Sequence, residues 1–304
     1  MGKKFLRGIN VSFLLLIIIS TFSSCANEMN VFEGNNNRQI NFSVSVPEWK
    51  NTDSLATTKI TRAMPVGGTI LSTSNTFNLI ADQNDGAGNY STLISSQAVS
   101  YTNNIWKTSN DYYWSGTANK TISFYAYYPS TISNISHTAG SSPTLSYTVP
   151  DNVSDQIDIM TATNNNVNGN TNSSTPLTFN HIFAAIQFSV GSAGIGSGTI
   201  SSISIGNVAN SGTYTFGSGW SNVTGSKAFT ISQSKPIAGT PGAEIYSGNY
   251  TLMMIPQDVN NITITVTYSN GGALTKTISG KWEAGKVYKY NLSYQPRDFA
   301  YTGT

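Results

Sequence analysis

Apolar and polar side chains alternate along most of the chain from residue 40 onward. In the clearest case, four apolar residues fall on one face of an extended segment: Ile40, Phe42, Val44 and Val46. Because successive side chains of a strand point to opposite faces, this spacing predicts a half-buried strand. We expect the strand to end at Pro47, which has no backbone N–H to donate. Similar alternation occurs in segments 77–79, 122–128, 145–149, 186–190, 203–205, 214–216, 250–254, 262–268 and 288–294.

Residues typical of turns separate these segments. Asn270-Gly271-Gly272 stands between two alternating segments and predicts a hairpin. After residue 24, no window shows a 3.6-residue apolar stripe with helix caps. Many short strands with Gly, Asn and Ser turns are typical of antiparallel sandwiches. The sequence therefore predicts an all-β fold of two tandem antiparallel β-sandwich domains.

One segment marks a boundary between the two predicted domains. Residues 163–176 are rich in Asn, Ser and Thr, and Val167 is their only apolar side chain besides the proline. Such composition is typical of a long loop or an interdomain linker. We place the N-terminal domain at 63–170 and the C-terminal domain at 171–304. The preceding residues 48–62 are predicted to be a polar linker.

The first 24 residues have the features of a secretory signal. Lys3, Lys4 and Arg7 precede a short apolar run at 11–19, which is too short to span a bilayer. The signal ends in Phe-Ser-Ser-Cys, residues 22–25, which resembles the cleavage motif of bacterial lipoproteins. We therefore predict that Cys25 is acylated, for example with palmitate, and anchors the protein to the outer membrane. The alternative is an ordinary secreted protein in which this cysteine has no role.

Composition excludes several classes of function. Charged residues make up 10% of the chain, and the formal net charge is +2. Removal of residues 1–24 takes three of the 16 basic residues, which leaves 13 against 14 acidic ones and a net charge of −1. This balance argues against nucleic-acid binding, which needs a basic face. One cysteine and two histidines allow neither an intrachain disulfide nor a Cys/His zinc site. We expect no metal and no cofactor.

The titratable residues give no support for an enzyme. His181 lies between two phenylalanines, so we expect a packed, hydrogen-bonded histidine. His137 lies in a Ser/Gly-rich loop, where solvent exposure is expected. Asp155 and Asp158 are three residues apart, which would place them on opposite faces of an extended segment. No nucleophile motif accompanies them, so the sequence predicts no catalytic residues.

Two aromatic clusters admit two interpretations. Tyr112-Tyr113-Trp114 forms one cluster, and Tyr125, Tyr127 and Tyr128 form the other. We expect core and cross-strand packing, which is the usual role of such side chains in a sandwich. The alternative is an exposed platform on which sugar rings stack.

Several motifs, taken in order, resemble the fimbrillin-like family of Bacteroidia, which includes subunits of type V pili. The resemblance spans about residues 36–295 and is carried by segments 112–114 (YYW), 123–129 (SFYAYYP), 158–162 (DIMTA), 177–190 (LTFNHIFAAIQFSV), 254–257 (MIPQ) and 282–290 (WEAGKVYKY). It implies that both β-sandwich domains are transthyretin-like.

The resemblance also implies proteolytic processing. In this family an arginine-specific protease removes a lipidated leader together with the first strand. Residues 25–62 would form that leader, and Arg62-Ala63 is the bond that matches. The position suits proteolysis, since exposed polar linkers are readily cut. Arg38 is the other arginine between Cys25 and Arg62, but cleavage there would leave the strand in place. The alternative is that Arg62 is a plain surface arginine.

Loss of the first strand would leave a groove that an extended segment of another subunit fills. In the C-terminal segment, Phe299 and Tyr301 alternate as a donor strand would, although the apolar stripe is shorter than the one it replaces. The implied function is a structural subunit of a surface fimbria, a homo- or heteropolymer assembled by donor-strand exchange. Two alternatives stay open: a non-polymerising surface lipoprotein that binds glycan or a host protein, and a pilus tip or anchor.

Overall fold

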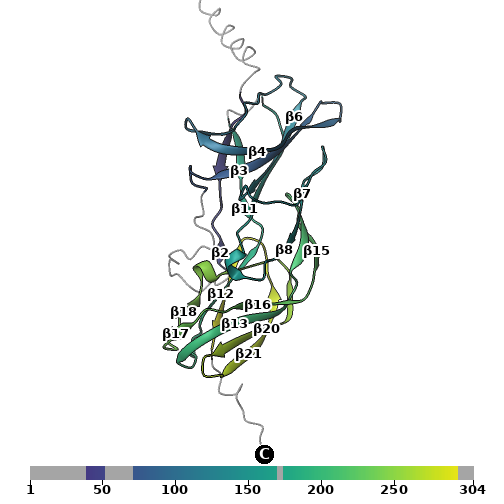
Figure 1. Cartoon of the computed structure of the whole chain (residues 1–304). Coiled ribbons are helices and arrows are strands. Elements are labelled where there is room, and N and C mark those ends of the chain that lie inside the picture. Colours follow the sequence, from purple (N-terminus) through teal and green to yellow (C-terminus); the bar gives the residue numbers. More distant parts are fainter. Residues whose placement is uncertain (1–38, 52–70, 170–173, 294–304) are drawn as a thin grey trace, which may run out of the picture.

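A computed structural model of the chain describes residues 39–51, 71–169 and 174–293, and within these ranges it consists of strands, turns and two short 3-10 helices (Figure 1). The 3-10 helices span Val153–Asp155 and Gly248–Tyr250. The prediction of an all-β, sandwich-type fold is confirmed. Within these residues there is no helix long and apolar enough to cross a membrane.

The N-terminal part is an eight-stranded sheet in the order β10-β1-β5-β4-β3-β6-β9-β11. Its two outermost strands, β10 and β11, are separated in the chain by Phe179 alone, so the sheet curls around its own core. Phe42, Phe77 and Phe124 are among the side chains of that core. The strands are β1 (Phe42–Ser45), β3 (Thr76–Asn84), β4 (Tyr90–Thr102), β5 (Ile105–Thr108), β6 (Thr121–Tyr128), β9 (Met160–Val167), β10 (Thr175–Thr178) and β11 (Asn180–His181).

The C-terminal part is built from two five-stranded sheets around a second, larger core. Ile186 and Phe188 of one sheet and Ile203 and Ile264 of the other belong to the same buried cluster. The first sheet contains β2 (Lys50–Asn51), β12 (Ala184–Val190), β18 (Glu244–Tyr246), β19 (Leu252–Met254) and β22 (Lys286–Leu292). The second contains β13 (Gly198–Val208), β16 (Lys227–Ile231), β17 (Lys235–Ile237), β20 (Asp258–Tyr268) and β21 (Ala273–Lys281).

The predicted hairpin turn lies in the second of these sheets. Asn270-Gly271-Gly272 joins β20 to β21, which pair antiparallel. Gly271 has a φ of +89°, a conformation that glycine adopts without strain, and its N–H donates to the carbonyl of Tyr268 (3.0 Å). The prediction is confirmed.

A fourth sheet, which we call the bridging sheet, joins the two halves of the chain in the order β15-β14-β8-β7. Its strands are β7 (Ile135–Ser136), β8 (Thr144–Thr148), β14 (Ser211–Thr215) and β15 (Gly219–Thr224), and it lies between the upper and lower parts in Figure 1. Conversely, β10 and β11 follow residue 171 but belong to the N-terminal sheet. The strands on the two sides of 170/171 therefore belong to the same sheet. The prediction that this position divides two domains, each folding as a unit, stays a prediction.

Candidate functional site around the first strand

Strand β1 lies in the interior of the eight-stranded sheet, between β10 and β5. It pairs parallel with β10 and antiparallel with β5. Thr175 and Phe179 donate their backbone N–H groups to the carbonyls of Asn41 (2.9 Å) and Ser45 (2.8 Å). On the other side, Ile40 donates its N–H to the carbonyl of Tyr112 (2.7 Å). The first strand thus pairs its backbone with neighbours on both sides.

The apolar face of segment 40–46, which contains β1, closes the N-terminal core. Ile40 and Phe42 are 2% and 3% exposed, and the Phe42 ring meets Phe124 edge-on with 5.3 Å between centroids. Val44 and Val46 pack against the same core but stay half-exposed. The intervening serines point to solvent. Burial therefore alternates along the strand as predicted and weakens toward Pro47.

The chain after β1 makes a second contact, this time with the C-terminal part. The Trp49 side chain is buried in the C-terminal core and stacks on the His181 ring, with 4.1 Å between centroids and 24° between planes. Strand β2 then pairs parallel with β22, and Lys50 donates its N–H to the carbonyl of Gly285 (2.8 Å). The prediction of a polar linker from residue 48 is wrong for this part. The sequence feature that could have predicted this contact is Trp49 itself, a large apolar side chain among polar neighbours.

His181 lies directly beneath Trp49 and pairs with Asp158. The His181 Nδ1 to Asp158 Oδ2 distance is 2.7 Å, and both side chains are 3% exposed. Burial raises the pKa of the Asp158 carboxyl, and the hydrogen bond from His181 opposes that rise. The prediction of a packed, hydrogen-bonded histidine is confirmed. Asp155 is exposed while Asp158 is buried, so the two carboxylates do not form a pair.

His137 is not the exposed loop residue that the sequence predicted. Its side chain is 11% exposed, and its Nε2 lies 2.9 Å from Oδ2 of the fully buried Asp82 on β3. The same oxygen accepts the backbone N–H of Gly140 (2.9 Å). The prediction is wrong because Asp82, distant in the sequence, holds this loop against the sheet.

The aromatic clusters pack as expected. Trp114 is buried and meets Phe124 edge-on at 5.9 Å, and Tyr125 and Tyr127 are also buried. Tyr113 is the exposed member of the first cluster. The buried rings cannot form the platform on which sugars were alternatively expected to stack.

The remaining predicted site residues lie outside the described residues. They are Cys25, Arg62, Ala63, Phe299 and Tyr301. Lipidation, cleavage and strand donation therefore stay predictions.

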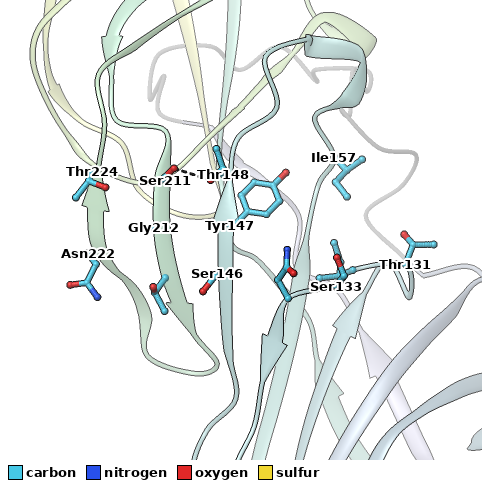
Figure 2. Close-up of a pocket in the computed structure, with 13 residues that line it drawn as sticks. Thr131, Ser133, Ser146, Tyr147, Thr148, Ile157, Ser211, Gly212, Asn222 and Thr224 are labelled. Carbon is cyan, nitrogen blue, oxygen red and sulfur yellow. Dashed lines mark hydrogen bonds between the residues drawn. The ribbon is translucent and has the colours of Figure 1, made fainter.

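A hollow of about 630 Å³ is lined by residues of the bridging sheet, of segment 131–134 and by Ile157 (Figure 2). All of its lining residues are uncharged, and Thr148 Oγ1 and Ser211 Oγ lie 2.9 Å apart within it. The ring of Tyr147 borders the hollow, as Figure 2 shows. In the part of the chain that the structure describes, no group of three or more His, Cys, Asp or Glu side chains could hold a metal ion.

Comparison with known proteins points to one family. The chain matches the fimbrillin-like family over residues 61–303, a range that begins beside Arg62 and leaves out β1 and β2. A putative cell adhesion protein from Bacteroides ovatus has a similar fold, with a TM-score of 0.57 and 15% identity over 86% of this chain and 93% of that one. A putative cell adhesion protein from Bacteroides uniformis has a TM-score of 0.51 and 16% sequence identity, over 84% of this chain and 94% of that one. No curated protein matches the chain.

Proposed function

The chain belongs to the fimbrillin-like family and is thus a fimbrial subunit of the cell surface, and we propose that it polymerises by donor-strand exchange after its leader is removed. The leader in this proposal is residues 25–62, which include β1, and the bond cut is Arg62-Ala63. An arginine-specific protease makes the cut. The family is one of structural and adhesive proteins, and catalysis forms no part of the proposal.

The observation that carries the proposal is the place of β1 in its sheet. It is an interior strand, yet it comes from the N-terminal side of Arg62. Its loss would leave β10 and β5 facing each other across a gap one strand wide. Each would then present unpaired backbone groups, which are a template for strand addition.

The apolar side chains of β1 make this gap costly to leave open. A fully buried apolar side chain contributes about 1.5–3 kcal/mol. With Ile40 and Phe42 fully buried and Val44 and Val46 half-buried, the strand contributes about 4–9 kcal/mol. A subunit without it is therefore strongly driven to accept a replacement strand.

The replacement strand in this proposal comes from another subunit of the fibre. A segment that alternates apolar and polar residues can restore both the core and the backbone pairing. Phe299 and Tyr301 of a second copy have the required alternation, with fewer apolar positions than β1. The fibre is a homopolymer if they insert and a heteropolymer if another subunit supplies the strand.

Lipidation at Cys25 delivers the subunit to the outer membrane in this proposal. The cysteine precedes β1, so the lipid anchor and the first strand leave together when Arg62-Ala63 is cut. Release from the membrane and activation for assembly are thereby the same event. The glycan-binding alternative is not proposed, because Trp114, Tyr125 and Tyr127 are buried and Tyr113 is the one fully exposed ring of the two clusters.

Mapping the mature N-terminus tests this proposal. The protein is expressed with its signal in a bacterium that exports it, and monomer and polymer fractions are analysed by mass spectrometry. We expect polymer to begin at Ala63 and monomer at acylated Cys25. Arg62→Ala should retain the leader and abolish polymer, whereas the matched variant Arg38→Ala should assemble normally. Polymer that carries acylated Cys25 would overturn the proposal.

A further inference from the structure

The segment 39–51 contacts both cores, and its second contact is a socket in the C-terminal part. Trp49 fills this socket, seven residues after Phe42 fills the N-terminal core. Beyond it, β2 extends the β12-β22 sheet by one short strand. Departure of the leader after cleavage at Arg62 would remove both contacts, since both precede that bond.

The socket is open to a replacement because it borders a large groove. The groove has a volume of about 1130 Å³ and is lined by Pro47, Glu48 and Lys50 on the leader side. His181, Trp220 and Trp282 line it on the opposite side. Departure of the leader would remove Pro47, Glu48 and Lys50 from the lining of this groove.

The floor of the socket is polar. The Trp49 side chain lies against the Asp158 carboxyl, and a hydrogen bond from it opposes the rise that burial causes in the pKa of that carboxyl. Nε2 of His181 is buried and makes no hydrogen bond within the described residues. A buried polar atom without a partner costs stability, so an occupant that also pairs with this nitrogen would gain a contact that the leader does not make.

We propose that this socket is a second acceptor site, which takes an aromatic side chain of the incoming donor segment. The inference rests on the proposed function, because the socket opens only if the leader leaves. The flat stack on the imidazole and the depth of burial select an aromatic ring over an aliphatic side chain. The donor segment should therefore carry an aromatic residue seven positions after the one that replaces Phe42, a spacing that the pair Phe299 and Tyr301 does not have.

Peptide exchange on the cut protein tests the socket. The full mature chain carries Cys25→Ser to prevent acylation, and residues 59–63 are replaced by the site of a sequence-specific protease. After cleavage, the bound leader is challenged with labelled peptides of residues 39–51. The peptides are wild type, Trp49→Ala, Trp49→Phe, Phe42→Ala and the exposed-face control Ser43→Ala. Affinity is measured by fluorescence anisotropy, and the imidazole signals of the two histidines are followed by NMR.

We expect the Trp49→Ala peptide to bind at least about tenfold more weakly than wild type, and the Trp49→Phe peptide within about threefold of it. The His181 signals should shift with ring occupancy of the socket, while those of His137 stay fixed as an internal reference. Equal affinity of the Trp49→Ala and wild-type peptides, with weaker binding of Phe42→Ala, would overturn the socket and leave strand exchange standing. Failure of every peptide to bind would overturn strand exchange as well.

Discussion

The Tyr147 side chain shows how packing by neighbouring residues changes the pKa of a single hydroxyl. Its ring packs inward from β8, 5.2 Å from the Phe183 ring and 6.5 Å from the Trp220 ring. Burial raises the pKa of its hydroxyl to about 12, because a phenolate would lose its hydration there. The side chain that borders the uncharged hollow is therefore itself neutral.

This shift makes stability depend on pH in the alkaline range. In the unfolded chain a tyrosine loses its proton near pH 10, whereas folded Tyr147 keeps it to about 12. Between these values the folded state binds more protons, so the free energy of unfolding falls as pH rises. We expect Tyr147→Phe to remove about 1 kcal/mol of that loss at about pH 11, after allowance for partial exposure. Urea unfolding at about pH 8 and about pH 11 measures the loss of stability in wild type and in the variant. Tyr113→Phe, at an exposed position, is the matched control. Equal losses in wild type and Tyr147→Phe would contradict the assignment.

At the scale of the element, β1 is a four-residue strand whose neighbours come from distant parts of the chain. Its partner β10 follows it by more than a hundred residues, and the two pair over Phe42 to Ser45. The hydroxyls of Ser45 and Thr178, 3.2 Å apart, add an exposed polar contact. Burial and the backbone ladder therefore hold β1 in place.

Hydrogen exchange should report the loss of this strand directly. The amides of Thr175 and Phe179 donate to the carbonyls of Asn41 and Ser45 in the leader, so their protection depends on the leader. After cleavage and removal of the leader, we expect the peptide that covers β10 to exchange at least about tenfold faster. Peptides from β3 should change little, because β3 pairs with β4 and β6 instead. Mass spectrometry measures both in one sample, and equal protection of β10 before and after removal would count against the groove.

At the scale of the whole molecule, the bridging sheet ties the two halves together. β8 from the first half pairs with β14 from the second over five residue pairs. Side chains reinforce the connection: Tyr127 meets Phe216 edge-on at 6.2 Å, and the hydroxyls of Thr161 and Tyr214 lie 3.0 Å apart in a buried position. The halves thus share both backbone and core contacts.

We expect the halves to stay together when the chain is cut between them. A protease site inserted at 170–173 allows the folded protein to be cleaved, and size-exclusion chromatography then tests for association. The shared sheet and core predict one peak of unchanged elution volume and a single unfolding transition. Leu145→Ala, which removes a fully buried side chain of β8, should lower stability by about 2–5 kcal/mol and weaken that association. Two separately eluting fragments would show instead that 170/171 divides independent folding units.

The sequence by itself determined the local structure. The period-two alternation at Ile40, Phe42, Val44 and Val46 fixed which side chains of the first strand face the core, because that period is a property of extended backbone. The same pattern, with turn residues such as Gly271, excluded a helical fold. The ordered motifs indicated the family, and with it the fimbrial role.

The tertiary structure alone decided which strands meet and what covers them. The alternation of residues 122–128 places Phe124 and Tyr127 on opposite faces of the strand, but the structure alone shows that Phe124 lies in the N-terminal core and Tyr127 in the C-terminal core, so both faces of β6 are buried. The interior position of β1, the socket of Trp49 and the burial of His137 depend in the same way on residues far apart in the chain. A periodic pattern records how a segment is extended, whereas strand pairing depends on contacts that form only when distant segments are brought together.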